Sequence, residues 1–214
     1  MANNYLSSYD LHSTETIVSH FDCVTNKDNK TKSLGNILEL VKNGGSFKET
    51  IQEIRTTTDE KTRSELKKTL PAVTISGQFA NSRNLNELIN HTGFLHIDFD
   101  KVDDLEKSME ILKKDPFSFS VFLSPSGNGI KVLVKISNIK NEHLKYFKSL
   151  EKYYYKEYNL KVDPQCKDIT RAMFLSYDPD IFVNENSKVF EIITYDTDNI
   201  CLLYTSDAAE KRIV

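Results

Sequence analysis

The chain has 214 residues, of which 39% are hydrophobic and 28% are charged, so it is long enough to fold around a buried core as one domain with at most a small addition. Its formal net charge of −3 excludes a nucleic-acid binder that relies on overall positive charge, and any such binding must come from a local patch. The absence of a long apolar run and of a signal-like N-terminus predicts a cytoplasmic protein without a membrane segment, and three widely spaced cysteines argue against a disulfide framework or a CxxC zinc site.

The first 70 residues predict one strand followed by three helices, a segment that is either part of the core or appended to it. The strand covers residues 16–24, and the helices cover residues 34–42, 46–55 and 60–68. Ser33 offers an N-cap to the first helix and Gly44 ends it, while Asp59 lies near the start of the third. The third helix is the most basic local stretch, a pattern more typical of a solvated face than of a nucleic-acid contact.

Residues 71–200 predict the core of the domain. We expect strands at residues 70–79, 94–99, 117–123, 130–136, 160–163, 172–177 and 189–193, and helices at residues 84–90, 105–114 and 142–158. Gly77 is expected to end the first strand, and the last helix is expected to pack through Leu144, Phe147, Leu150 and Tyr154. The turn sequence at 124–129 joins two strands into a hairpin. This order predicts an α+β fold with a mixed or mainly antiparallel sheet covered by helices.

The C-terminal residues 201–214 stand apart from this pattern. Residues 201–209, with the sequence CLLYTSDAA, look like the translation of a sequencing-adapter end. We therefore expect a non-native tail on the front piece of a longer protein, and the alternative is a genuine polar tail.

Two carboxylates close the apolar strand at 94–99. Asp98 and Asp100 are two positions apart, so their side chains point to the same face and can approach one hard cation together. The alternative is that they only mark the end of the strand and begin a turn. His96 lies on the same face and is a candidate to support a metal from the outer shell, unless it is an ordinary strand histidine.

Two later features fall at the ends of strands that can lie beside this one. Asp163 follows a short apolar stretch, and a third carboxylate would complete the oxygen ligands that a pair of Mg²⁺ or Mn²⁺ ions needs. The hairpin turn contains Gly127 and Gly129, which allow close approach of a ligand to backbone N–H groups, and Lys131 adds a positive charge for a phosphate.

The order of these parts resembles the archaeo-eukaryotic primase and primase-polymerase superfamily, whose motifs are an acidic pair at a strand end, a basic turn and a later lone aspartate. More closely, the chain is similar to the N-terminal domain of virulence-associated protein E family proteins from Bacteroidetes and their mobile elements. The matching stretches are LPAVTISG with Phe79, TGFLHIDFD, LSPSGNGIKVLV and DPQCKDITRAMFLSYDP, within a resemblance that covers most of residues 16–195.

The resemblance implies a primase-polymerase-like fold and metal-dependent nucleotidyl transfer in DNA replication. In that reading Asp98, Asp100 and Asp163 are the catalytic residues that hold Mg²⁺ or Mn²⁺, Ser126 and Lys131 contact the nucleoside triphosphate, and Arg171 binds phosphate. The implied partners are a nucleic-acid template, nucleoside triphosphates and a helicase or P-loop ATPase in the missing C-terminal part.

One departure from the superfamily opens an alternative. This chain has Lys131 where the superfamily has histidine, and a lysine is a poorer proton shuttle at neutral pH although it can hold a phosphate. The alternative is a catalytically inactive module that keeps the primase fold and binds nucleic acid or docks a downstream helicase.

Overall fold

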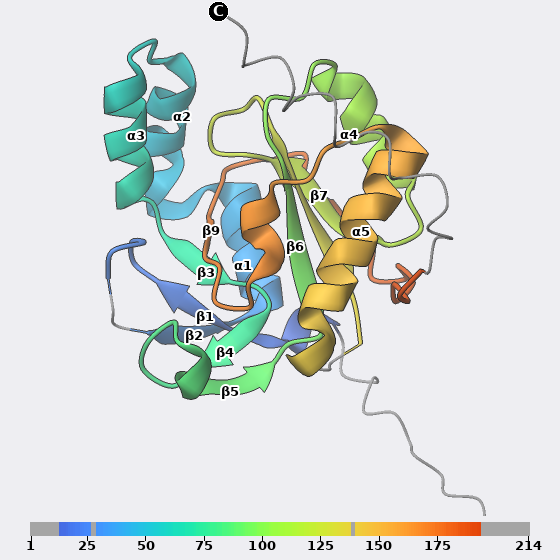
Figure 1. Cartoon of the computed structure of the whole chain (residues 1–214). Coiled ribbons are helices and arrows are strands. Elements are labelled where there is room, and N and C mark those ends of the chain that lie inside the picture. The colour runs from blue at the N-terminus through green and yellow to red at the C-terminus, as the bar shows by residue number, and fades with distance from the viewer. Residues whose placement is uncertain (1–12, 27–28, 138–139, 194–214) are drawn as a thin grey trace, which may run out of the picture.

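The computed structural model describes residues 13–26, 29–137 and 140–193; the predicted tail at 201–214 lies outside them. Three antiparallel sheets and the helices around them form an α+β fold (Figure 1), which confirms the predicted class. The helices are α1 (Leu34–Asn43), α2 (Lys48–Thr56), α3 (Glu60–Thr69), α4 (Leu105–Lys114) and α5 (His143–Tyr158), with 3₁₀ turns η1 (Ser13–Glu15), η2 (Gly45–Phe47), η3 (Leu85–Glu87), η4 (Lys140–Glu142) and η5 (Pro164–Lys167). The strands are β1 (Ile17–Phe21), β2 (Lys30–Ser33), β3 (Ala72–Thr74), β4 (Gly77–Phe79), β5 (Leu88–His91), β6 (Phe94–Phe99), β7 (Ser118–Leu123), β8 (Ile130–Lys135), β9 (Met173–Phe174) and β10 (Phe182–Val183).

The N-terminal segment is built into the rest of the chain. One sheet has the order β2-β1-β3-β9, so it joins strands from both sides of residue 70. Helix α1 begins where the Ser33 side chain accepts a hydrogen bond from the backbone N–H of Asn36, and it ends at Gly44, whose φ of +81° suits a glycine. Its buried Ile37 belongs to the same apolar cluster as Phe94 of β6.

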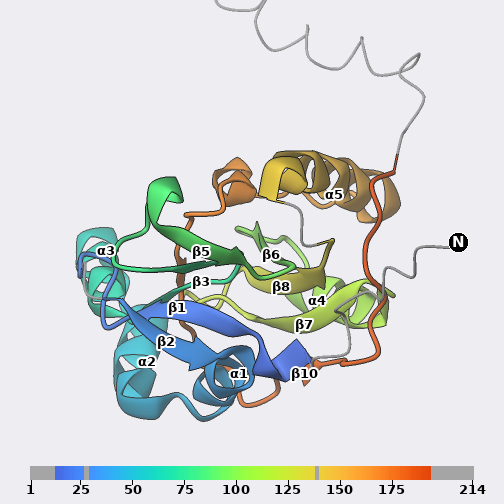
Figure 2. The same ribbon diagram turned by 90° about the horizontal axis from the view of Figure 1, so that it is seen from below.

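The second sheet, with the order β10-β7-β8-β6, is the layer that carries the candidate site. Alternation along β6 sends Leu95, Ile97 and Phe99 into an apolar cluster with α5, while Phe94 faces the cluster that contains α1. Figure 2 shows α5 on one side of this sheet and α1 with β1 and β2 on the other. Strand β6 lies at the edge of the sheet and therefore has one free side.

Two segments before β6 differ from the sequence prediction. The strand expected at 70–79 breaks into β3 and β4, and Gly77 begins β4 instead of ending a strand. A Cβ at Gly77 would lie 2.8 Å from Cδ1 of Leu88, so the glycine allows close packing against β5. The helix expected at 84–90 is limited to η3, because Leu88–His91 pairs with β4 as a strand.

The second half of the chain contains fewer strands than predicted. Residues 160–163 and 189–193 form no strand, although Phe190 makes an isolated bridge with Ile136, and the strand expected at 172–177 is limited to β9. Leu144 of α5 is 53% exposed and lies off the packed face, where Phe147, Leu150 and Tyr154 are buried as expected. The sheet is completed by β10, which the sequence pattern did not predict.

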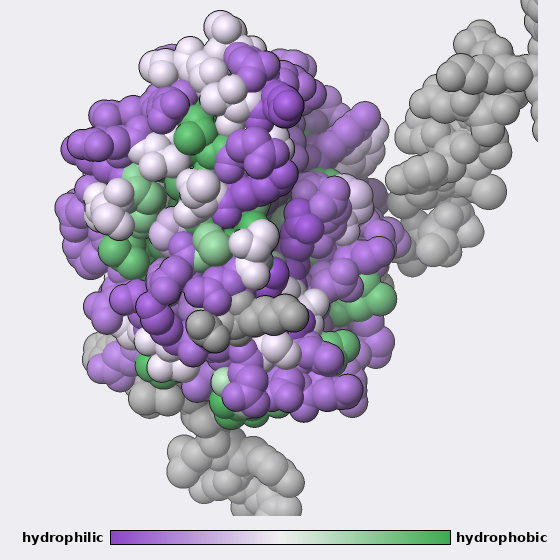
Figure 3. Space-filling view, turned by 90° about the vertical axis from the view of Figure 1, so that its left-hand side faces the viewer, coloured by the Kyte–Doolittle hydropathy of each residue, from purple (hydrophilic) through white to green (hydrophobic). Residues whose placement is uncertain are grey.

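The molecular surface is largely polar on the side shown in Figure 3, where apolar residues are interspersed among hydrophilic ones. Across the described ranges, none of the helices combines the length and apolar composition that a membrane crossing requires.

Candidate functional site

The candidate site begins with a cross-strand ion pair. The antiparallel register of β6 and β8 places Asp98 directly opposite Lys131. The Lys131 Nζ lies 2.6 Å from each Asp98 carboxylate oxygen and donates to both. The lysine side chain is 6% exposed and the aspartate side chain 18%, so the pair is largely shielded from water.

Opposing effects set the charge of Asp98. Burial disfavours the charged form and would raise the pKa of the Asp98 carboxyl, but Lys131, with smaller contributions from His96 and Arg171, outweighs it. The resulting pKa lies below the usual value for aspartate. Asp98 is therefore an ionised carboxylate at neutral pH, already neutralised by a lysine.

Asp163 reaches the free edge of β6 without forming a strand. Its backbone N–H donates to the carbonyl of Asp98 at 2.9 Å, and its carboxylate accepts a hydrogen bond of 3.0 Å from the backbone N–H of Gln165. The second bond caps η5, which begins at Pro164. The sequence predicts that Asp163 ends a strand beside that of Asp98. The residues before it form no strand, and its contact with β6 is the single backbone hydrogen bond to Asp98.

Asp100 lies one step beyond the end of β6 and is exposed. Asp100 is the strongest charge acting on the Lys67 ammonium of α3, so this lysine lies near the end of β6. Burial lowers the pKa of Lys67, and Asp100 opposes that effect. Lys67, which the sequence prediction placed on a solvated basic face, thus lies near the acidic strand end.

The turn between β7 and β8 is held tightly against β6. A Cβ on Gly129 would lie 2.6 Å from the carbonyl oxygen of Phe99, so only glycine fits without displacement. Gly127 has a φ of +73°, and its N–H donates to the Ser124 carbonyl at 2.9 Å. Ser126 is half-buried in the same turn, and phosphate binding by this turn stays a prediction.

Arg55 of α2 fixes this turn from the N-terminal half of the chain. Its guanidinium donates to the carbonyl oxygens of Ser124 and Pro125 at 3.2 and 3.3 Å, and to that of Tyr177 at 2.8 Å. One arginine therefore connects α2, the hairpin turn and the segment after β9.

Behind the ion pair lies a buried histidine without a hydrogen-bond partner. His96 is 1% exposed, and both of its ring nitrogens are unpaired among the described residues. Burial lowers its pKa to about 4 against the opposing influence of Asp98, so the ring is neutral at pH 7. Cys166 of η5 is also buried, and its Sγ belongs with a His96 nitrogen and an Asp98 oxygen to a group whose atoms lie within 4.8 Å of one another.

The group of three nearby ligand atoms is not the one expected from the sequence. In the described ranges it consists of His96, Asp98 and Cys166, and it leaves out Asp100 and Asp163. The sharing of Mg²⁺ or Mn²⁺ by the three aspartates therefore stays a prediction. Its donor chemistry is suitable, since all three side chains offer the oxygen ligands that hard cations prefer.

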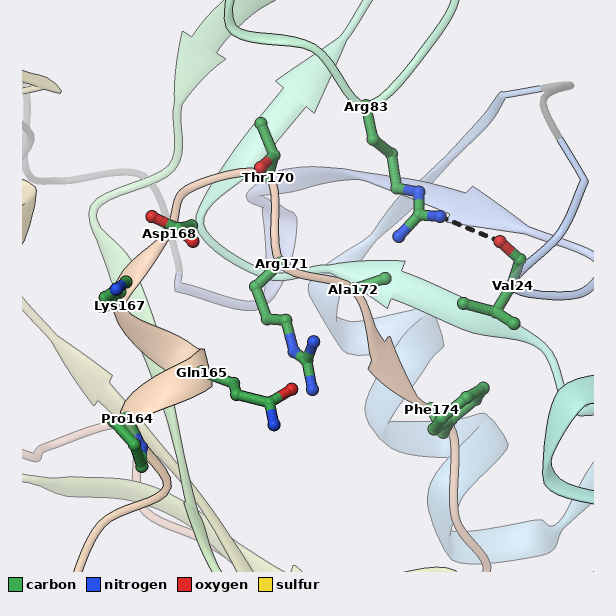
Figure 4. A pocket seen from close by; sticks show the side chains of 10 residues that line it. All are labelled: Val24, Arg83, Pro164, Gln165, Lys167, Asp168, Thr170, Arg171, Ala172 and Phe174. Carbon is green, nitrogen blue, oxygen red and sulfur yellow. Dashed lines mark hydrogen bonds between the residues drawn. The ribbon is translucent and has the colours of Figure 1, made fainter. Parts of the chain in front are cut away.

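A basic pocket of about 590 Å³ is lined in part by η5, the turn that follows Asp163 (Figure 4). Its lining includes Arg83 from the segment after β4, Lys167 of η5 and Arg171, together with Asp168 and six residues that carry no charge. Arg171 lowers the pKa of Arg83 beyond the effect of burial, which shows that the two cations are close, and it also acts on Asp98. None of the three basic side chains forms an ion pair within 4.0 Å among the described residues.

The structure thus gathers several of the predicted residues and adds others. Asp98, Lys131, Asp163 and Arg171 lie around the end of β6, with Asp100 at its margin. Lys67, Arg83 and Arg55 come from distant segments and had no local motif to reveal them. Cys166 had one local signal, its position three residues after Asp163.

Fold and site together define an α+β domain with an acidic strand end paired to a buried lysine and bordered by a basic pocket. Residues 65–182 match the family model for the BT4734-like, N-terminal domain, and the chain belongs to that family. The matched residues extend from α3 to β10 and contain every candidate from Lys67 to Arg171. Searches of curated proteins and of solved structures give no match.

Proposed function

We propose that this domain transfers nucleotides to a growing nucleic-acid strand, as a metal-dependent primase or primase-polymerase of a mobile-element replication protein. The observation that carries the proposal is the position of Asp98 and Asp163 at one strand edge beside Lys131, with a basic pocket next to them. The resemblance to virulence-associated protein E and to primase-polymerases is part of this proposal and adds a cytoplasmic location and a downstream helicase or P-loop ATPase.

The reaction joins a 3′-oxygen to the α-phosphorus of a nucleoside triphosphate and breaks the bond to the β-phosphate oxygen. Pyrophosphate leaves with the electron pair of that bond, and the hydroxyl proton passes to solvent. Mg²⁺ or Mn²⁺ held by Asp98, Asp100 and Asp163 would supply charge stabilisation for the attacking and leaving oxygens.

The protein's own side chains would contribute mainly positioning and charge. Arg83 and Arg171 have no ion-pair partners among the described residues. Arg83 donates one hydrogen bond to the Val24 carbonyl, and the positive charges of both arginines would hold the phosphates of a triphosphate or of a template. Lys67 is placed to neutralise charge near Asp100, and Ser126 would meet the triphosphate from the hairpin turn. Such fixed positive charges lower the barrier of phosphoryl transfer without any covalent chemistry by the protein.

The second candidate is an inactive module that binds nucleic acid or docks a downstream helicase. The specific observation in its favour is the bidentate ion pair between Asp98 and Lys131, because it already neutralises the carboxylate that would bind a metal. A domain that had lost catalysis and replaced the metal by a lysine would have this arrangement.

A primer-extension assay separates the two candidates. The purified chain is incubated with Mn²⁺ or Mg²⁺, a primed or unprimed template and labelled nucleotides, and products are resolved by length. We expect extension by the wild-type chain and a loss of at least about a hundredfold in Asp100→Asn, because a metal ligand is removed. Asp103→Asn, an exposed aspartate in the following turn, is the matched control and should keep wild-type activity.

Binding measurements complete the test. Arg171→Gln should weaken template or nucleotide binding about tenfold, whereas Lys152→Gln on the exposed side of α5 should not. Template binding without any extension in either metal would support the inactive module, and the absence of both binding and extension would overturn both candidates.

A further inference from the structure

The group formed by His96, Asp98 and Cys166 is distinct in chemistry from the aspartates of the proposed transfer site. His96 and Asp98 project from the same face of β6, and η5 brings Cys166 to them across the free edge of that strand. One donor atom from each side chain lies within 4.8 Å of the other two. A single ion between them can therefore contact all three after small side-chain adjustments.

The donors are an imidazole nitrogen, a carboxylate oxygen and a thiol sulfur. Mg²⁺ and Mn²⁺ favour oxygen ligands, whereas Zn²⁺ and similar transition metals are bound by this mixture of nitrogen, sulfur and oxygen. Three protein ligands also leave the fourth tetrahedral position open. The ligand set thus selects a borderline-soft transition metal.

His96 provides an independent indication of a ligand. Both of its ring nitrogens are buried and unpaired among the described residues, although buried polar atoms in folded proteins are nearly always hydrogen-bonded. Leu95 and Ile97 point to the opposite face of β6, so they do not supply the missing partners. A metal bound to one ring nitrogen would give that nitrogen a partner and leave only the other one unpaired.

We propose that His96, Asp98 and Cys166 bind one Zn²⁺-class transition metal ion. The Cys166 thiol gives up its proton to solvent on binding, and the neutral ring of His96 binds without losing one. Lys131 contacts both oxygens of Asp98, so it can keep one while the other turns to the metal. The ion enters on the side of Asp98, whose side chain is 18% exposed, whereas those of the other two ligands are closed off.

This metal site does not rest on the proposed nucleotidyl transfer. The two share Asp98, but the transition-metal site uses neither Asp100 nor Asp163. Variants at Asp100 therefore test the transfer reaction, and variants at Cys166 and His96 test the new site.

Cobalt(II) substitution provides the direct test. The full chain is stripped with a chelator and titrated with Co²⁺, and the thiolate-to-cobalt charge-transfer absorption and the bound Co²⁺ per chain are measured, followed by displacement with Zn²⁺. We expect one Co²⁺ per chain with a charge-transfer band that Zn²⁺ abolishes. Cys166→Ser should remove the band, and His96→Gln should lower the affinity at least about tenfold.

Two controls separate this site from other ligands. Cys23→Ser removes a free cysteine outside the group and should keep the band, and Asp100→Asn should keep it as well. Circular dichroism of each variant verifies folding. A wild-type chain that shows no charge-transfer band on titration would overturn the proposal without any variant, and so would a band that persists in a folded Cys166→Ser variant.

Discussion

The ion pair between Asp98 and Lys131 is the residue-scale feature on which both proposals depend. Replacement of Lys131 by methionine would leave a shielded carboxylate without its cation. In chelator-treated protein we expect a loss of about 3 kcal/mol in the free energy of unfolding, measured by urea denaturation at neutral pH, because breaking a buried pair exposes the desolvation cost of the remaining charge. The double variant Asp98→Asn/Lys131→Met should recover part of that loss.

A surface pair in α5 provides the comparison. The Nζ atom of Lys148 lies 2.8 Å from a carboxylate oxygen of Glu151 in an exposed setting. Lys148→Met should therefore lower the unfolding free energy by less than about 1 kcal/mol. Equal losses for the two lysine variants would show that burial does not govern the energy of the Asp98 pair.

Gly129 tests how tightly the hairpin turn is held against the end of β6. An added methyl group would lie 2.6 Å from the backbone carbonyl oxygen of Phe99, an atom that cannot move away without disturbing the strand. We expect Gly129→Ala to lower the unfolding free energy by about 2 kcal/mol in thermal or urea denaturation. Asn128→Ala, at an exposed position of the same turn, should have little effect.

At the scale of an element, substitutions in α5 test which face of this helix packs against the sheet. Phe147 is fully buried, and Phe147→Ala should lower the unfolding free energy by about 3 to 4 kcal/mol, because it removes apolar contacts and leaves a cavity. Leu144 lies one turn away and is 53% exposed, so Leu144→Ala should lower the unfolding free energy by less than about 1 kcal/mol. A large effect at Leu144 in urea denaturation would show that the helix is rotated relative to this structure.

Elements with strong local patterns could be predicted from the sequence. Helix α1 has its N-cap at Ser33 and its end at Gly44, and β6 and the β7-β8 hairpin are rich in apolar residues and bounded by turn residues. The elements that the sequence did not predict depend on pairing with other segments of the folded chain. Leu88–His91 looks helical with the residues before it, and it becomes β5 only because β4 offers a partner.

The residues of the candidate site also fall into two groups, those that the sequence could indicate and those that only the fold brings together. Asp98, Asp163 and Lys131 follow strand ends and a turn, so local patterns and strand register could indicate them. Lys67 and Arg83 come from segments without a motif, and only the folded chain brings them near the aspartates. The spacing of the cysteines in the sequence gives no sign of the cluster with Cys166, because the cluster depends on the approach of η5 to β6.

At the scale of the whole molecule, buried histidines make stability depend on pH. The pKa of His143 is lowered from 6.5 to about 3, chiefly by burial and further by the neighbouring His91 and His96. The unfolded chain therefore binds a proton first as the pH falls, and stability is lost from about pH 6.5 downward. In urea denaturation between about pH 7 and pH 5, His143→Gln should show a slope shallower by up to about 1.4 kcal/mol per pH unit. An unchanged slope would mean that this histidine is not kept neutral by the fold.

The free side of β6 has a consequence for the behaviour of the molecule in concentrated solution. An uncovered edge strand is a template on which another chain can add a strand, and the route from Val162 to Cys166 covers part of this one through the bond from Asp163 to the Asp98 carbonyl. The segment that carries the candidate ligands thus also protects against self-association. A substitution in this segment can therefore change both the candidate site and the protection of the strand edge.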